Sequence, residues 1–241
     1  MPQSGEAALA PWLDAWMQSH DVPLWGVADL QGFTTPADAS GQGFAAALAF
    51  ALPMDRAVMA SIQVGPNQAY ADLYASLNRR INDTGTKLAA DLGQRGIRAQ
   101  ALAASQRTDP FNIRGDFPHK TAATRAGIGW IGRNCQLITR PYGPWVRLGT
   151  VFTDFPLKEP GPAMERSFCG TCTKCISACP ASALQGAAWF AGLAREALLD
   201  AQRCDTWKKA NYAQYHNGHN CGICSAVCPH GLKGLTRGQG C

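Results

Sequence analysis

The sequence predicts a two-domain protein of the mixed α+β or α/β class, with an α/β domain over residues 1–160 and a small cysteine-rich domain over residues 161–241. In the first part, apolar runs of strand length alternate with helical stripes, which is typical of a sheet layered with helices. In the second part, eight of the ten cysteines lie between Cys169 and Cys228. The 241 residues are 46% apolar, so the chain can build a substantial core.

The first half of the α/β domain begins with an amphipathic helix, predicted over residues 7–19 because its apolar residues recur at helical spacing. Residues 22–30 follow as a strand candidate. The apolar run 44–53 is too short to cross a membrane and suits a buried strand or core helix. Residues 56–64, bounded by a Gly-Pro pair, are a further strand candidate.

The second half contains the longest predicted element, a helix over residues 67–92 with one apolar stripe and a glycine stop after it. A strand over residues 97–103 comes next, and a helix between strands favours a layered sheet. Residues 105–118 are predicted as loop and residues 119–126 as a short helix. Residues 136–153 are predicted as a hairpin that closes the domain.

Two further segments complete the expected organisation. The proline-rich residues 156–162 are predicted as the linker between the domains. Within the cysteine-rich domain, the Ala- and Leu-rich residues 186–202 are predicted as a helix that separates two groups of cysteines.

The cysteines follow the spacing of bacterial ferredoxins. Three two-residue-spaced thiols are followed by a fourth before a proline, and a shorter version of the pattern recurs near the C-terminus. In that pattern the fourth cysteine binds the other cluster of a pair. We therefore expect two [4Fe-4S] clusters, cluster 1 held by Cys169, Cys172, Cys175 and Cys228, and cluster 2 by Cys179, Cys204, Cys221 and Cys224. Zinc also binds Cys-x-x-Cys pairs and is the alternative, but zinc sites rarely show this spacing.

The charge pattern limits the kinds of partner that the protein is expected to bind. The net charge is +5, and residues 1–68 hold one basic and six acidic side chains, against 21 and 11 in residues 69–241. The basic residues are scattered, so nucleic-acid binding is not favoured, and an anionic cofactor or an acidic electron donor fits as well. With no signal-peptide pattern and no membrane-length apolar run, we expect a soluble cytoplasmic protein with no membrane partner.

A glycine-rich loop is the main non-cysteine motif. It contains Gly127, Gly129 and Gly132 around Trp130, three glycines within six residues. Glycines let main chain approach a flat, bulky ligand closely, although any tight turn also uses them.

Residues 119–134 and 147–154, together with the two cysteine groups, resemble the epoxyqueuosine reductase family over residues 70–229. The resemblance implies a cobalamin-binding α/β domain, distantly like nitroreductases, followed by the two-cluster ferredoxin-like domain, a plan shared with reductive dehalogenases. It also implies an oxidoreductase in which the clusters pass electrons to cobalamin, which reduces a substrate while a protein acid supplies a proton.

The resemblance assigns roles to particular residues. Gly127, Gly129 and Trp130 would border the cobalamin, and Tyr74 would match a tyrosine that faces the active pocket. The family's acidic residue, in a Val-Asp-Ser-Ala-Pro segment, has no counterpart in the matching residues 103–110. By position, the candidate proton donors are Asp109, Asp116 and His119, each of which a loop charge or a helix cap also explains.

The substrate and partners are left open by the resemblance. The chain ends at Cys241 without the helical repeats with which the family helps to hold transfer RNA, so transfer RNA is not the expected substrate. We expect a cobalamin-dependent reductase that acts on a small-molecule or corrinoid-linked substrate and receives electrons from an external low-potential donor. The alternatives are a non-catalytic electron-transfer protein that docks a redox partner such as a corrinoid protein, and a nucleic-acid-modifying enzyme.

Overall fold

The computed structural model describes residues 6–154 and 161–236. Its centre is a four-stranded sheet in the order β1-β2-β6-β3, in which every neighbouring pair is antiparallel. The strands are β1 (Leu24–Asp29), β2 (Ala46–Pro53), β3 (Ala99–Leu102) and β6 (Val146–Thr153). The sequence left open the α+β and α/β classes, and the antiparallel pairing assigns this sheet to the α+β class.

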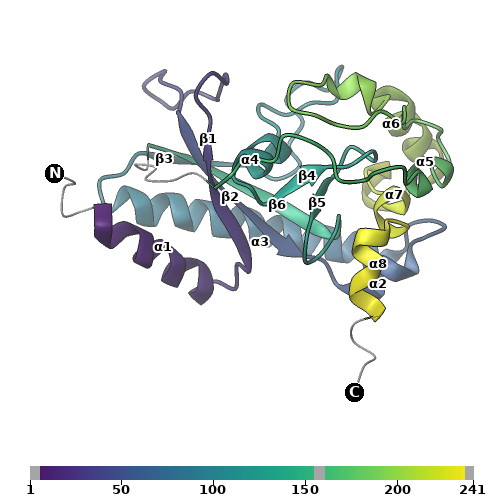
Figure 1. Ribbon diagram of the computed structural model, residues 1–241, viewed down its shortest axis with the longest axis horizontal. Helices are drawn as coiled ribbons and strands as arrows, with labels where there is room; N and C mark the ends of the chain where they lie inside the picture. Colours follow the sequence, from purple (N-terminus) through teal and green to yellow (C-terminus); the bar gives the residue numbers. More distant parts are fainter. Residues whose placement is uncertain (1–5, 155–160, 237–241) are drawn as a thin grey trace.

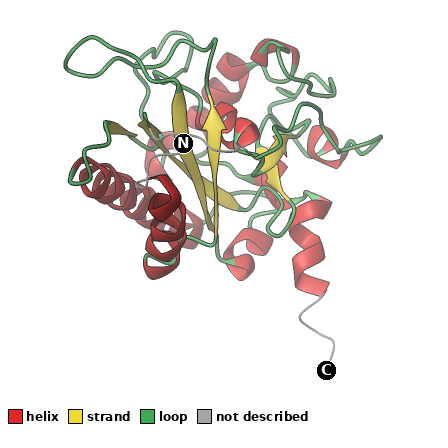
Figure 2. Ribbon diagram, turned by 60° about the vertical axis from the view of Figure 1, so that its left-hand side comes forward, coloured by secondary structure: helices red, strands yellow, loops and turns green. Residues whose placement is uncertain are grey.

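Helices cover both faces of this sheet (Figures 1 and 2). One face packs against α1 (Glu6–Ser19) and α3 (Gln68–Gly93), and the other packs against α4 (His119–Arg125). The central strand β2 is buried on both sides, because its even-numbered residues from Leu48 to Leu52 join the α1 and α3 core and its odd-numbered alanines from Ala47 to Ala51 join the α4 core. Side chains alternate between faces along a strand, so one apolar run serves two cores.

Most of the predicted elements are confirmed in type and place: α1, β1, β2 as a strand, α3, β3 and α4. One strand prediction is wrong. Residues 56–64 contain the helix α2 (Arg56–Ser61), which starts where the Asp55 carboxylate accepts a hydrogen bond from the backbone N–H of Val58. This N-cap outweighed the strand-like composition.

The predicted hairpin over residues 136–153 is also wrong. Strand β5 (Leu137–Thr139) pairs with β4 (Gly129–Ile131), whereas β6 pairs with β2 and β3. The chain turns tightly after β5, with reciprocal backbone hydrogen bonds between Thr139 and Gly143. The two strands thus leave for different sheets.

The cysteine-rich part consists of short helices joined by turns: α5 (Lys174–Ser177), η1 (Arg195–Ala197), α6 (Ala201–Asn211), η2 (His216–Gly218), α7 (Ile223–Ala226) and α8 (Pro229–Thr236). The helix predicted over residues 186–202 does not form. Gly186 and Gly192 have φ of +88° and +92°, outside the helical region, and α6 begins later, after its N-cap Asp200.

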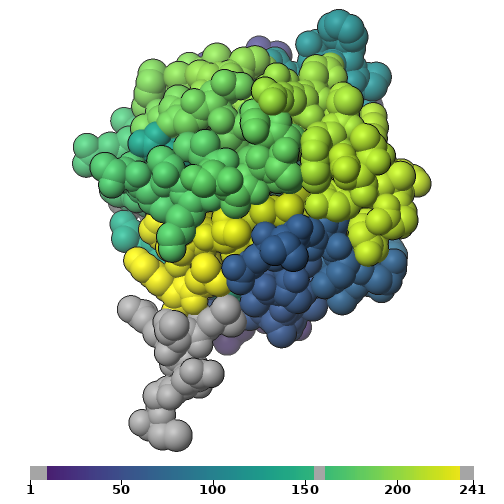
Figure 3. All heavy atoms as spheres, turned by 90° about the vertical axis from the view of Figure 1, so that its right-hand side faces the viewer, coloured from purple at the N-terminus to yellow at the C-terminus, as the bar shows by residue number. Residues whose placement is uncertain are grey.

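This part packs tightly on the sheet-containing part. The indole Nε1 of Trp145 donates a 2.8 Å hydrogen bond to the carbonyl of Ser225, and Gly231 leaves the space that the Trp145 ring fills. Figure 3 shows the cysteine-rich part lying directly against α2 and the start of α3. Most of the predicted linker lies outside the described residues, and the helices that are described include none able to cross a membrane.

Candidate functional site

The first four-cysteine set surrounds a cavity of about 220 Å³, the cluster 1 cavity. Three of its thiols come from the turn that leads into α5 and from α5 itself, and the fourth immediately precedes Pro229. The cysteines that line it are Cys169, Cys172, Cys175 and Cys228.

The second set lines another cavity, of about 200 Å³, the cluster 2 cavity. Its cysteines are Cys179, Cys204, Cys221 and Cys224. The structure therefore brings together each set that the ferredoxin spacing predicts, with Cys179 and Cys228 exchanged between the two halves. Among the described residues no three His, Cys, Asp or Glu side chains converge to hold a single metal ion, and the thiols stand around the two hollows instead.

Several of these thiols are in an environment that disfavours thiolate without a metal. Burial, reinforced by the neighbouring cysteines, raises the pKa of Cys175 and of Cys228 to about 11. Burial likewise raises the pKa of Cys224. Bound iron would reverse this preference, because a coordinating thiol is deprotonated outright.

Unpartnered polar atoms gather beside these cavities. In the described part of the chain, the buried side-chain nitrogen and oxygen atoms without a hydrogen-bond partner are Nε1 of Trp130, Nε of Arg133 and both amide atoms of Asn220. Arg133 lines the cluster 1 cavity, Asn220 lines the cluster 2 cavity, and Trp130 packs in one buried cluster with Cys228. An unsatisfied buried donor costs about 1–3 kcal/mol, and cluster sulfur is an acceptor. The three N–H donors therefore fit the bound clusters.

A further cavity of about 220 Å³ adjoins the cluster 2 cavity. The two share their lining residues Gln136, Pro144, Val146 and Arg147. We call these two cavities together the central hollow. It runs from the cluster 2 cysteines, past Tyr74 on α3, to His119 at the start of α4.

Tyr74 is held in the central hollow by Arg147 and Ser105. The Arg147 guanidinium carbon lies 4.0 Å from the centre of its ring, and its hydroxyl is 2.9 Å from Oγ of Ser105. Burial pushes the pKa of Tyr74 upward, but the positive charge of Arg147 and hydrogen bonds from Ser105 and Asn78 outweigh it and leave the pKa below its ordinary value. Tyr74 is therefore a better proton donor than a free phenol.

His119 and Asp116 also line the central hollow, but they differ in what they can donate. Burial, followed by the nearby charge of Arg147, lowers the pKa of His119 to about 4. Its Nδ1 lies 2.8 Å from Oγ1 of Thr150. The imidazole is thus neutral at pH 7 and has no imidazolium proton to give, whereas Asp116 is exposed at the mouth.

Asp109, the remaining predicted acid, lies outside the two cavities of the central hollow. Its carboxylate accepts hydrogen bonds from the backbone and side-chain nitrogens of Asn112, at 2.9 and 2.6 Å. These bonds lower its pKa and identify it as a turn-stabilising group in this conformation.

Gly127, Gly129 and Trp130 do not line the two cavities of the central hollow, and their contact with cobalamin stays a prediction. A Cβ on Gly129 would collide with the carbonyl oxygen of Ile138 in the paired strand β5. A Cβ on Gly127, which has φ of +71°, would stand 2.9 Å from the carbonyl oxygen of Pro162. These glycines allow backbone to pack on backbone, and Trp130, 3% exposed, packs near cluster 1.

The loop of residues 105–118, the rim loop, borders the central hollow through Ser105, Gln106 and Gly115 to Pro118. It is tied to the cysteine-rich part. Arg107 forms a 2.8 Å ion pair with Asp205, the neighbour of Cys204. Three more ties join the rim loop to that part: Arg114 to Glu196 at 2.6 Å, Arg195 to the carbonyls of Asn112 and Ile113, and Gln202 to the carbonyl of Phe111.

Sequence reasoning missed Arg147, Gln136 and Asn220 as lining residues. Arg147 opens the segment 147–154 that carries the family resemblance, which was the available signal. Asn220 directly precedes the cluster ligand Cys221, but one polar residue beside a cysteine motif has no special pattern.

Two four-cysteine cavities beside a helix-covered sheet define a double-cluster iron–sulfur protein. In agreement, residues 168–231 match the family model described as 4Fe-4S double cluster binding domain. The epoxyqueuosine reductase of Gloeobacter violaceus is 35% identical over 136 residues, covering 52% of this chain and 39% of the relative. That of Vibrio cholerae is 27% identical over 248 residues, covering 93% of this chain and 59% of the relative.

Solved structures show the same fold. A selenomethionine-labelled epoxyqueuosine reductase matches with a TM-score of 0.59 at 20% identity, covering 94% of this chain and 66% of that chain. A catabolic reductive dehalogenase in complex with 3-bromo-4-hydroxybenzoic acid matches with a TM-score of 0.65 at 18% identity, covering 90% of this chain and 31% of that one. The chain is similar in sequence to epoxyqueuosine reductases, spans 39% and 59% of the two curated relatives above, and shares its fold with reductive dehalogenases.

Proposed function

We propose that the chain is a cobalamin-dependent iron–sulfur reductase with its active site in the central hollow. The observation that carries the proposal is that this hollow opens directly onto the cysteines of cluster 2 and holds Tyr74 beside Arg147. When bound, the clusters would supply single electrons and cobalamin the two-electron reduction of an electrophile. The names of the relatives support a reductase, and the substrate proposed here is a small or corrinoid-linked molecule.

The lining of the central hollow suits a large, flat cofactor. Pro144, Val146 and Leu148 give it an apolar side, while Arg147 and Gln136 provide polar groups at the junction of the two cavities. A corrinoid is larger than the cavity that adjoins cluster 2, so it would lie beside the bound cluster and extend through the open mouth. Its contact with protein would then come from β6 and from the chain around β5.

Proton supply is assigned to Tyr74. Its phenolic O–H would donate to the substrate, and the positive charge of Arg147 beside the ring would stabilise the resulting phenolate. Ser105, 2.9 Å from the phenol oxygen and itself exposed, would return a proton from solvent. His119 and Thr150 would hold the neighbouring wall by their mutual hydrogen bond.

The test is cobalamin binding by anaerobically reconstituted protein, followed by absorbance titration. We expect binding by the unmodified protein and its loss in Gln136→Trp, because this exposed residue lines both cavities and a larger side chain would fill their junction. Gln18→Trp, on the exposed side of α1, is the matched control and should bind normally. Absence of binding by unmodified protein that holds both clusters would replace this proposal with the electron-transfer alternative, in which the chain docks a corrinoid protein.

A further inference from the structure

We propose that electrons enter this protein at cluster 1, through a basic surface that docks an acidic one-electron carrier protein. We call this surface the cluster 1 face and define it by the exposed residues Arg166, Phe168, Lys174 and Lys233. This inference depends on one part of the proposed function, namely that the two clusters carry electrons, and it does not require cobalamin.

The positions of the two cavities give the direction of electron flow. The cluster 2 cavity is part of the central hollow, whereas the cluster 1 cavity is lined by neither Tyr74 nor Arg147. Asn134, 2% exposed, lines both cluster cavities and donates a hydrogen bond to the carbonyl of Cys224. Cluster 1 thus stands behind cluster 2 as seen from the central hollow, at the outer end of the chain of redox centres.

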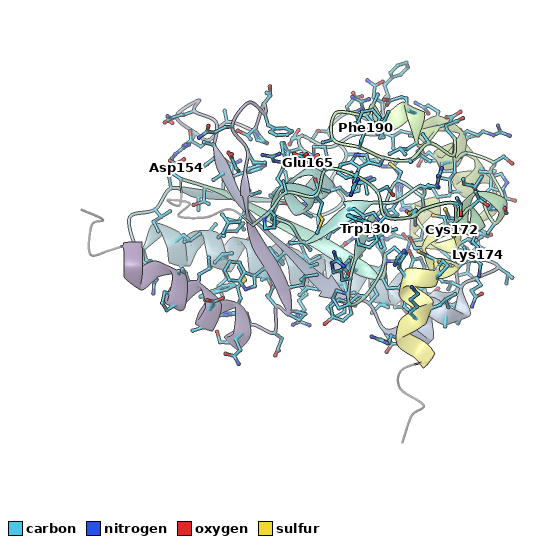
Figure 4. The ribbon with its side chains drawn as sticks, in the orientation of Figure 1. Trp130, Asp154, Glu165, Cys172, Lys174 and Phe190 are labelled. Carbon is cyan, nitrogen blue, oxygen red and sulfur yellow. The ribbon has the colours of Figure 1, made fainter. Side chains whose placement is uncertain are left out.

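Cluster 1 also lies near the surface. Figure 4 shows Cys172 and Lys174 together at the edge of the molecule opposite Asp154. Lys174 is exposed and lies in α5, between two cysteines that line the cluster 1 cavity. A partner seated on this edge would therefore approach the cluster closely.

The segments that carry the cluster 1 ligands are basic, and the nearest acidic residue in the sequence is Glu165, immediately before them. The two segments that carry its ligands, residues 166–179 and 228–236, contain Arg166, Lys174 and Lys233 but no Asp or Glu. Arg133, which lines the cavity, donates to the backbone carbonyls of Gly170 and Gly186 and not to a carboxylate. Within the described residues, neither Arg166 nor Lys174 forms an ion pair.

Cluster 2 has a different electrostatic setting. Its ligand Cys204 is followed by Asp205, whose buried carboxylate pairs with Arg107 and Lys209 at 2.8 Å each. This one carboxylate offsets part of the positive charge of Arg107, Lys208 and Lys209. In the described part of the chain, Arg166 and Lys174 on the cluster 1 face have no such internal partner, so they remain available to attract a negatively charged protein.

An exposed aromatic ring completes the docking surface. Phe168 precedes the ligand Cys169, and its side chain is 46% exposed. Its ring is fixed edge to face on buried Trp130, with 5.3 Å between centroids, so it is held in place without a partner. A rigid aromatic centre with a charged rim is typical of protein interfaces, and transient redox contacts are small enough to need only such a patch.

The test is the rate of cluster reduction, measured by stopped-flow absorbance under anaerobic conditions. The probe is a reduced flavodoxin of strongly negative net charge, and dithionite serves as a small reductant that needs no docking. The variant is Arg166→Glu combined with Lys174→Glu, with Lys174→Glu alone as a milder form. Arg79→Glu, an exposed position on α3, makes the same type of charge change elsewhere.

We expect the double variant to be reduced by flavodoxin about 10-fold more slowly or worse at low ionic strength, with the difference shrinking as salt screens the charges. Reduction by dithionite, whose small anions need no docking, should slow much less, and the iron content and the flavodoxin rate of Arg79→Glu should match those of the unmodified protein. A flavodoxin rate that is unaffected by the charge reversals, or an equal slowing with both reductants, would overturn the proposal. Cluster reduction is read without cobalamin or substrate, so this result stands apart from that of the cobalamin titration.

Discussion

Arg147 lies over the ring of Tyr74 at 4.0 Å, and both side chains reach the hydroxyl of Ser105, at 2.6 and 2.9 Å respectively. The guanidinium favours the phenolate, so the pKa of Tyr74 should rise in Arg147→Leu. The measurement is the phenolate absorbance as pH is raised, taken as the difference between each protein and its Tyr74→Phe counterpart. Arg79→Leu should leave the titration unchanged, and an unchanged curve in Arg147→Leu would remove Tyr74 from its assigned role.

Substitutions in the two cysteine sets should each damage a different cluster. Reconstituted protein should hold about eight iron atoms per chain, four in each cubane. Cys175→Ala should damage cluster 1 and Cys224→Ala should damage cluster 2, because the two thiols line different cavities. Electron paramagnetic resonance of the reduced proteins, with iron analysis, distinguishes the two. Cys135→Ala lies outside both cavities and serves as the control, and stoichiometric zinc in place of iron would contradict the assignment.

Asn220 should adjust the potential of cluster 2. Its amide is 1% exposed, has no hydrogen-bond partner and lines that cavity. A donor to cluster sulfur stabilises the more negative reduced state, so Asn220→Leu should make the cluster 2 potential more negative while cluster 1 and the iron content stay the same. A redox titration followed by electron paramagnetic resonance measures this. The exposed Asn211→Leu is the matched control, and equal potentials in both variants would refute the contact.

A side chain at residue 129 should destabilise the fold. Because its Cβ would meet the Ile138 carbonyl, Gly129→Val should lower the free energy of unfolding by about 2 kcal/mol or more, whether or not cobalamin is present. Gly93→Ala, where a Cβ meets no atom within 4 Å, should be tolerated. Denaturant unfolding of reconstituted protein compares them. A stable Gly129→Val protein that fails only in cobalamin binding would support the glycine-rich loop as a cofactor wall.

His119 should make stability depend on pH. Its folded-state pKa of about 4 lies below the ordinary 6.5, so the unfolded chain binds the additional proton between these values. Stability is then fully present above pH 6.5 and is lost as pH falls toward 4, by about 3 kcal/mol in total. Unfolding in urea at pH 7.5 and pH 5 should show a smaller difference for His119→Gln than for the unmodified protein. Equal differences would mean that the imidazole is charged or exposed in the folded state.

The sequence and the structure agree where the information is local. The stripe of α3 repeats over many turns, and the cysteine spacing is set by the geometry of a cubane, so both were predictable from short segments. The helix predicted over residues 186–202 failed because composition alone does not reveal backbone such as that of Gly186, with φ of +88°.

The central hollow was not predictable in the same way. Tyr74, Ser105 and Arg147 come from a helix, a loop and a strand, and their meeting depends on long-range packing. The glycine-rich loop is ambiguous for a different reason. Glycine at residue 129 is consistent with a nearby ligand or with a neighbouring strand, and the register of β4 on β5 accounts for it by the strand.

The ion pair between Arg107 and Asp205 has a consequence for how the protein matures in the cell. The rim loop is anchored to α6 by this ion pair, and α6 contains the cluster 2 ligand Cys204. Short metal-dependent segments order only when their metal is inserted. Iron should therefore be inserted before the rim loop orders. Cells starved of iron should accumulate a chain whose sheet is folded but whose rim loop is not ordered at the central hollow.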